Sequence, residues 1–221
     1  MLLSVKLFIF DMGGVVANNV AIINLIASHF GISEDDFFLG SGSDPKVTYT
    51  SPYHLGDVAA IMRGEISSGC FWSNFSKRTG IAVPLHDVPE NLPGYSSGSD
   101  PWYDFFNPVL DEGALGIIGS LKSLGHRVVC GTNTLDAHYR RHSERGDYSV
   151  FDAVYASHIM GIIKPDPAFW TNILEKEKVL PGEAFFVDDL EENIKAAAEL
   201  GLKTHLFKGA AGLKHIINNE L

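Results

Sequence analysis

Apolar residues fall into short runs along the chain, and most of the runs end at a polar residue or a glycine. Short runs rich in β-branched and aromatic residues are typical of buried strands. Five such strands are expected, at residues 4–10, 127–131, 151–156, 184–187 and 203–207. Apolar residues at helical spacing predict helices at residues 111–124, 169–179, 189–200 and 212–221. This alternation predicts an α/β fold, in which a parallel sheet of about five or more strands has helices on both faces.

The segment between the first run and residue 111 follows a different pattern. It has helical periodicity but no convincing alternating strand, so we expect an inserted helical subdomain. The expected division is a core of residues 1–17 and 107–221 and a helical cap of residues 18–106. Cap helices are expected at residues 19–30, 55–63 and 67–78, with a capping box at residues 33–36. Two turn-rich segments, 40–53 and 94–100, interrupt them, and their role is not readable from the sequence.

Composition narrows the class of protein. A chain of 221 residues with 45% hydrophobic content can bury one core and a modest insertion. The net charge of −10 and the absence of Lys/Arg blocks argue against nucleic acid and anionic membranes as partners. Cys70 and Cys130 lack zinc-site spacing, which favours a reducing compartment. We expect a cytoplasmic protein, as a monomer or a homodimer, whose N-terminal apolar run is a strand rather than a signal peptide.

Polar residues with catalytic potential follow several of the predicted strands. Asp11 ends the first run and precedes two glycines, and Thr132 and Asn133 follow the second strand. Lys164 stands just before a predicted helix. Parallel strands bring their carboxyl ends to one edge, so these residues are expected to lie together. Taken singly, each also has an ordinary interpretation as a turn residue or an exposed lysine.

The fourth strand ends in two adjacent acids, Asp188 and Asp189, with Asn193 one turn along the next helix. Adjacent carboxylates repel each other unless a cation compensates them. A hard divalent ion with oxygen ligands, most plausibly Mg²⁺, would supply that charge and would also recruit Asp11. The alternative is that Asp189 caps its helix and Asp188 is solvated.

Taken in order, these motifs resemble those of the haloacid dehalogenase superfamily of hydrolases. The matching motifs are Phe8-Ile9-Phe10-Asp11, Gly131-Thr132-Asn133, Lys164-Pro165-Asp166-Pro167, and Val187-Asp188-Asp189 followed by Asn193. The resemblance implies a Rossmann-like sheet and a cap of the C1 type. The segments 63–67 and 125–129 resemble the branch that includes sugar-phosphate phosphatases.

The resemblance implies a two-step phosphoryl transfer, in which Asp11 attacks phosphorus and water then hydrolyses the aspartyl-phosphate. It implies that Mg²⁺ is bound by Asp11, the Gly13 carbonyl and Asp188. Lys164 would balance the carboxylates and, with Thr132 and Asn133, would hold the phosphate. The roles implied for Asp189 and Asn193 are support of the metal ligands or direct ligation. The substrate would be a small phosphate ester such as a sugar phosphate.

One position departs from the family pattern. Most phosphatases of the superfamily have a second Asp two residues after the nucleophile as general acid and base, and this chain has Gly13. General acid–base help is worth about 10²–10⁴ in rate, so we expect slow turnover, a good leaving group, or another acid. His54, Asp57 and Glu65 are candidate replacements, and nothing in the sequence selects one.

Other functions remain open at this point. A non-catalytic phosphate-binding or regulatory protein would tolerate Gly13. A haloacid dehalogenase would not need the paired acids, and a phosphonate-cleaving enzyme would need a Schiff-base lysine such as Lys46 or Lys77. Several cap aromatics are candidates for either an apolar lid or the cap core: Tyr49, Tyr53, Phe71, Trp72, Tyr95 and Trp102.

Overall fold

A parallel sheet of five strands, in the order β5-β4-β1-β6-β7, forms the centre of the core. The computed structural model describes residues 5–47, 51–83 and 100–220. The strands are β1 (Leu7–Phe10), β4 (Arg127–Thr132), β5 (Ala153–Ala156), β6 (Ala184–Asp188) and β7 (Lys203–Leu206). All neighbouring pairs in this sheet are parallel. The predicted α/β fold and its five strands are therefore confirmed.

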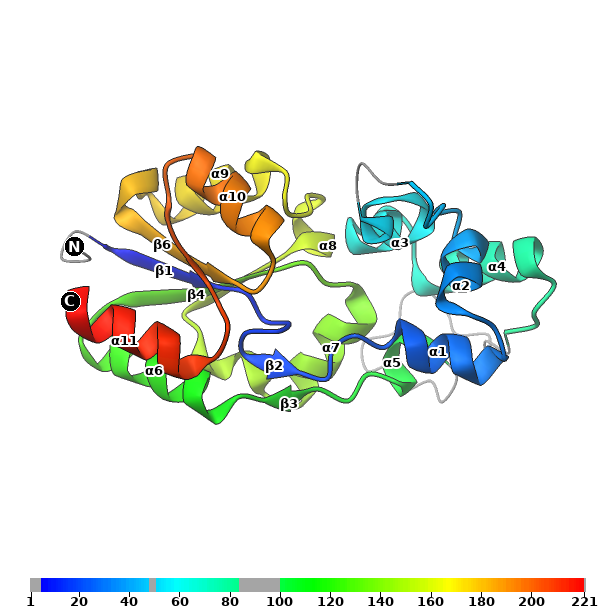
Figure 1. Cartoon of the computed structure of the whole chain (residues 1–221), viewed down its shortest axis with the longest axis horizontal. Helices are drawn as coiled ribbons and strands as arrows, with labels where there is room; N and C mark the ends of the chain where they lie inside the picture. Colours follow the sequence, from blue (N-terminus) through cyan, green and yellow to red (C-terminus); the bar gives the residue numbers. More distant parts are fainter. Residues whose placement is uncertain (1–4, 48–50, 84–99, 221) are drawn as a thin grey trace.

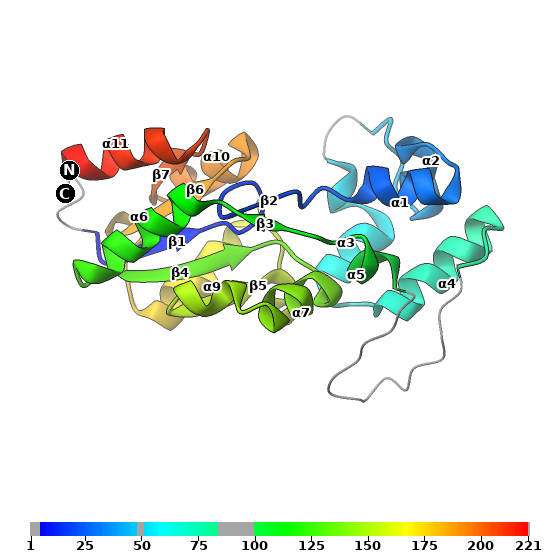
Figure 2. The same cartoon turned by 90° about the horizontal axis from the view of Figure 1, so that it is seen from below.

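Helices cover both faces of the sheet, as alternation along β1 requires. Phe8 and Phe10 pack against α6 (Glu112–Ser123) and α11 (Ala210–Glu220). Leu7 and Ile9 point to the opposite face, where α9 (Pro167–Glu177) and α10 (Glu191–Glu199) lie. Figure 2 shows α6 and α11 on one side of β1 and β4, and α9 on the other. These four helices were predicted to within two residues at each end.

The cap lies beside the carboxyl edge of the sheet (Figure 1). Its helices are α1 (Ile23–Phe30), α2 (Glu34–Gly40), α3 (Gly56–Met62), α4 (Ser68–Thr79) and α5 (Pro101–Asp104). They pack around a cluster of buried aromatics that includes Phe37, Phe71, Trp72, Phe75 and Trp102. The cluster gives the cap an apolar core, which Leu135 and Ala137 from outside the cap also join.

Two details of the cap differ from the sequence prediction. The helix expected from residue 19 begins at Ile23, because Asn19 has a φ of 60°, which no α-helix accommodates. Ser33 does cap α2, accepting the Asp36 N–H at 3.1 Å. The Asp36 carboxylate accepts the Ser33 hydroxyl at 2.7 Å, whereas a capping box has this side chain accept the backbone N–H of the capping residue.

A two-stranded ribbon joins the core and the cap. β2 (Ala17–Asn18) pairs antiparallel with β3 (Val109–Leu110), which the sequence did not predict because two-residue strands show no alternation. Asn19 Nδ2 donates to the Asn107 carbonyl at 2.9 Å beside this ribbon. The predicted domain limits fall at this ribbon, and the division into domains stays a prediction.

The core also contains α7 (Asp136–Glu144), α8 (Ser157–Met160) and 3₁₀ turns at Asp147–Val150 and Pro181–Glu183. A further 3₁₀ turn, Pro52–His54, lies in the cap. Both cysteines are free, with Cys70 exposed and Cys130 buried. In the described parts of the chain, no helix has both the length and the apolar character needed to cross a membrane.

Candidate active site

Asp11 lies at the carboxyl end of β1, in the middle of the sheet. Its backbone N–H donates to the Val187 carbonyl at 2.9 Å, which continues the pairing of β1 with β6. Its carboxylate accepts the Met12 N–H at 2.7 Å, and the residue is only 7% exposed. The sheet therefore fixes the backbone of Asp11 while its side chain faces the edge where the strands end.

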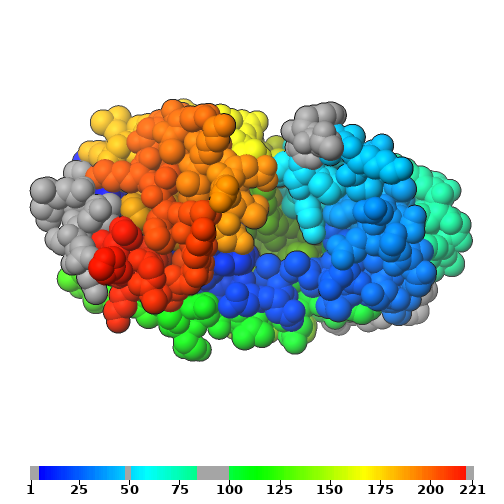
Figure 3. Space-filling view, in the orientation of Figure 1, coloured from blue at the N-terminus to red at the C-terminus, as the bar shows by residue number. Residues whose placement is uncertain are grey.

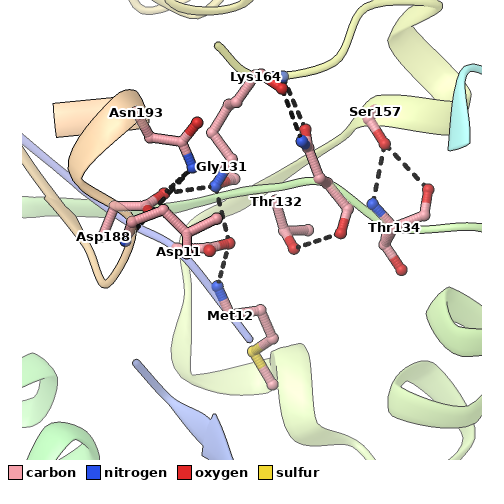
Figure 4. Close-up of polar contacts among 11 residues, drawn as sticks. Asp11, Met12, Gly131, Thr132, Thr134, Ser157, Lys164, Asp188 and Asn193 are labelled. Atoms are coloured by element: carbon pink, nitrogen blue, oxygen red, sulfur yellow. Dashed lines mark hydrogen bonds and ion pairs between the residues drawn. The ribbon is translucent and has the colours of Figure 1, made fainter. Parts of the chain in front are cut away.

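Lys164 forms the centre of a buried ion-pair network (Figure 4). Its Nζ lies 2.9 Å from Asp11 Oδ1 and 2.7 Å from Asp188 Oδ2, and it donates to the Gly131 carbonyl at 3.1 Å. Lys164 is 1% exposed, so the interpretation of an ordinary surface lysine is wrong. A buried ammonium of this kind is stable only with such partners.

Asn133 positions Lys164 through its backbone. The Asn133 side chain donates to the Lys164 carbonyl at 3.0 Å and accepts the Lys164 N–H at 2.8 Å. The neighbouring Thr132 is 3% exposed, and its hydroxyl lies 3.4 Å from the Asn133 carbonyl. Thr132 and Asn133 thus lie beside Lys164, as the strand-end argument predicted.

Asp188 is completely buried, and three hydrogen bonds hold it in addition to the one from Lys164. Asn193 Nδ2 donates to both carboxylate oxygens, at 3.0 and 3.1 Å, and the Leu190 N–H donates to Oδ1 at 2.9 Å. Asn193 therefore orients Asp188 through this contact. The alternative of a solvated Asp188 is wrong, because the residue is 0% exposed.

Three carboxylates converge at this edge of the sheet. Asp11, Asp188 and Asp189 each offer an oxygen, and these atoms all lie within 4.8 Å of one another. Asp189 packs closely on Gly14, where an added Cβ would lie 2.1 Å from Asp189 Oδ2. Gly14 also has a φ of +72°, so both space and backbone conformation require glycine there.

The charges in the cluster do not balance. Asp11, Asp188 and Asp189 face the single ammonium of Lys164, an excess of two negative charges when all are ionised. Burial raises the pKa of Asp11 to about 7, with Lys164 opposing and the two neighbouring carboxylates adding to the shift. Burial and Asp188 also raise the pKa of Asp189. Oxygen donors with uncompensated negative charge match a hard divalent cation.

A cavity of about 340 Å³ opens between the core and the cap above Asp11. Figure 3 shows the hollow between α10 and the cap. Asp11, Gly13, Thr132, Asn133, Lys164, Asp189 and Asn193 all line it. The structure thus brings all but one of the predicted site residues to one cavity, and the remaining one, Asp188, supports it from below.

Of the three candidate acids in the cap, only His54 lines the cavity. Its Nε2 lies 3.8 Å from Glu192 Oε1, and burial, the largest influence, lowers its pKa. Asp57 instead pairs with Arg78 at 2.7 Å, and Glu65 is exposed outside the cavity lining. Asp57 and Glu65 are therefore wrong as replacement acids.

The other cap candidates divide between core and cavity. Phe71 and Trp72 are 0% exposed and belong to the cap core, whereas Tyr53 and Trp102 line the cavity. Tyr49 and Tyr95 lie outside the described residues. Lys46 and Lys77 are exposed and do not line the cavity, which removes the basis for a Schiff-base lysine there.

Sequence reasoning did not single out His138, His142 and Tyr148, which line the cavity. The two histidines are four residues apart and so share one face of α7, a spacing that was available as a signal. It also missed Ser157, whose hydroxyl lies 2.7 Å from the Met62 carbonyl of the cap and 2.9 Å from the Thr134 carbonyl of the core.

Comparisons with known proteins point to one family of enzymes. Residues 103–201 match the family of haloacid dehalogenase-like hydrolases, a range that includes Thr132, Lys164 and Asp188. The chain is 25% identical over 211 residues to D-ribitol-5-phosphate phosphatase of Bacteroides thetaiotaomicron, covering 90% of each protein. It is 28% identical over 206 residues to mouse acyl-CoA dehydrogenase family member 10, covering 91% of this chain but only 18% of that protein.

A solved structure has the same fold. It is a haloacid dehalogenase family enzyme from Bacteroides thetaiotaomicron in complex with magnesium and inorganic phosphate. The TM-score is 0.66 at 24% identity, over 92% of this chain and 94% of that one. With its motifs in the family's order at the carboxyl edge of the same fold, the chain is a haloacid dehalogenase-like hydrolase.

Proposed function

We propose that this hydrolase is a Mg²⁺-dependent phosphatase that cleaves small phosphate monoesters through Asp11. The observation that carries the proposal is the convergence of Asp11, Asp188 and Asp189 within 4.8 Å around the buried Lys164. The relative that hydrolyses D-ribitol 5-phosphate supports the same reaction class.

The donor set suits Mg²⁺. Carboxylate oxygens of Asp11 and Asp188, with the Gly13 carbonyl, would hold the ion, and Asp189 is close enough to ligate it directly or through water. When bound, Mg²⁺ would neutralise charge on the phosphate and align it with the nucleophile. Asn193 would keep Asp188 in the orientation that ligation needs.

The protein's own groups would carry the chemical steps. An oxygen of Asp11 attacks phosphorus, the ester P–O bond breaks, and the alcohol leaves. Water then attacks the phosphorus of the aspartyl-phosphate and releases inorganic phosphate, which restores the carboxylate. Lys164 and the Thr132 hydroxyl would hold phosphate oxygens. The Asn133 side chain already bonds to the Lys164 backbone, so the backbone N–H of Asn133 is the group proposed to bind phosphate.

The leaving alcohol lacks the usual proton donor, because Gly13 has no side chain. His54 lines the cavity, but burial lowers its pKa, which makes it a poor replacement for a general acid. We therefore expect faster turnover of p-nitrophenyl phosphate, whose leaving group needs no proton, than of alkyl esters.

Hydrolysis of p-nitrophenyl phosphate, with Mg²⁺ and with EDTA, tests the proposal. Turnover should require Mg²⁺ and fall by roughly 10⁴-fold or more in Asp11→Asn, since the nucleophile is lost. Asp35→Asn, on the exposed surface of α2, is the matched control and should keep full activity. Phosphate binding without turnover in the wild type would favour the regulatory alternative, and equal turnover in EDTA would remove Mg²⁺ from the proposal.

A further inference from the structure

We infer that the substrate is the monophosphate of an apolar alcohol, such as an alkyl or isoprenyl chain, rather than of a sugar or polyol. The inference rests on the proposed phosphatase activity and concerns the alcohol part of the ester. It comes from the walls of the cavity that lie beyond the carboxylate cluster.

The cap contributes a mostly apolar wall. Of the eleven described cap residues that line the cavity, eight have apolar side chains, among them Val20, Ile22, Val58, Met62, Trp102 and Phe106. The polar ones are Ser51, Tyr53 and His54, close together in sequence, of which His54 faces Glu192 of the core. Among the described cap residues that line the cavity, none is acidic and none is a lysine or arginine.

Beyond the phosphate site, the core also contributes polar residues to the cavity. The Thr134 hydroxyl lies 3.4 Å from the Leu135 carbonyl, and Glu192 Oε1 lies 3.8 Å from His54 Nε2. His138 stacks on Phe106 with ring centroids 3.8 Å apart, and burial lowers its pKa to about 3, so its ring is uncharged. His142 is buried, and its Nδ1 already pairs with Asp147 Oδ2 at 2.8 Å. His138 thus offers no charge to the alcohol part of the ester, and one ring nitrogen of His142 is already occupied.

Three polar atoms in this region lack hydrogen-bond partners, namely Trp102 Nε1, His138 Nε2 and the Tyr148 hydroxyl. Each of these atoms is itself buried and has almost no accessible surface. Trp102 and His138 therefore present mainly carbon to the cavity. A wall of this kind binds by apolar contact rather than by hydrogen bonding.

The apolar cavity wall should bind apolar alcohols more tightly than polyols. Each sugar hydroxyl left without a partner weakens binding by roughly 5- to 150-fold. Each methylene group moved from water into an apolar wall strengthens binding by about fourfold. An apolar chain therefore gains from the same surface that penalises a polyol of similar size.

The test is a series of primary n-alkyl monophosphates from ethyl to octyl, compared with D-ribitol 5-phosphate at saturating Mg²⁺ and below micelle-forming concentrations. We expect kcat/KM to rise about fourfold per methylene over the first members, and octyl phosphate to exceed ribitol phosphate by about 100-fold or more. A flat series, or a preference for ribitol phosphate, would overturn the inference.

Two variants of Met62 test whether the alkyl chain lies against the cap wall. Met62→Gln places an amide in the apolar wall and should lower the octyl-to-ethyl ratio of kcat/KM by about tenfold, whereas Met62→Leu should preserve it. Leu39→Gln, at a cap residue that is 52% exposed and outside the cavity lining, is the control. An unchanged ratio in Met62→Gln would show that the alkyl chain does not lie against this wall.

Failure of the proposed function is distinguishable from failure of this inference. If p-nitrophenyl phosphate is hydrolysed but polyol phosphates are preferred to alkyl phosphates, only the inference fails. If no ester is hydrolysed, the dissociation constants of octyl phosphate and ribitol phosphate for the Asp11→Asn variant measure the preference of the cavity without catalysis. Tighter binding of octyl phosphate would then support the inference, and equal or weaker binding would overturn it.

Discussion

Two neighbouring glycines constrain the site in different ways. Gly14 has no space for a side chain because Asp189 lies against it, whereas a Cβ on Gly13 would meet only the Val20 side chain, with Cγ2 at 3.2 Å and Cβ at 3.9 Å. Gly13 is also outside the positive-φ glycines, so its backbone suits other residues. A side chain at position 13 therefore needs only a small movement of Val20.

That space makes the missing general acid testable. We expect Gly13→Asp combined with Val20→Ala to raise kcat on alkyl phosphates, by up to about 10²–10⁴-fold, because the carboxyl group can protonate the leaving alcohol. The rate on p-nitrophenyl phosphate should change little. Steady-state kinetics on both esters checks this, with Val20→Ala alone as the control. An equal gain on both esters would contradict the acid role.

Lys164 sets the electrostatic balance of the site before any cation binds. Lys164→Met keeps the apolar stem but leaves Asp11 and Asp188 without their shared partner, which should lower the free energy of unfolding by about 3–5 kcal/mol. Urea unfolding in EDTA measures this. Lys195→Met, at an exposed position on α10, should change stability by less than about 0.5 kcal/mol. A Lys164→Met variant as stable as the wild type would show that the ion pairs contribute little.

At the scale of elements, predictability followed the strength of the apolar pattern. β1, β4 and β6 are buried runs and were readable, and their ends correctly brought Asp11, Thr132 and Asp188 to one edge. No residue range was predicted for α7, because most of its residues are polar and only Ala137 and His142 are buried. The burial of Lys164 was equally unreadable, since it depends on partners that are distant in sequence.

α7 also makes the stability of the protein depend on pH. The pKa of His138 is lowered to about 3 by burial, below the ordinary value of 6.5, so between these values the unfolded chain binds the extra proton. Stability should therefore rise with pH across this window, by up to about 1.4 kcal/mol per pH unit from this residue. His138→Phe should remove this part of the slope in urea unfolding at several pH values. Parallel curves for the variant and the wild type would contradict the assignment.

At the scale of the whole molecule, the site lies where core and cap meet, and cation binding should stabilise the folded chain. With Mg²⁺ at 100 times its dissociation constant, we expect the free energy of unfolding to rise by about 2.7 kcal/mol. Asp188→Asn should lose most of this increment because it removes a ligand charge, whereas Asp35→Asn should retain it. Thermal or urea unfolding with and without Mg²⁺ measures the difference, and an equal increment in both variants would place the ion elsewhere.

The β2–β3 ribbon has a consequence for how such a protein can change. Ala17 pairs with Leu110 and Asn18 with Val109, so the chain leaves the core and returns to it at adjacent points. Paired antiparallel strands hold such points about 5 Å apart, a spacing that the ends of many different segments can match. The cap thus occupies the place of a long surface loop, and exchanging it would leave the strand order of the core intact. An exchange of the cap would therefore change the residues that contact the alcohol, whereas the carboxylates and Lys164 belong to the core and would be retained.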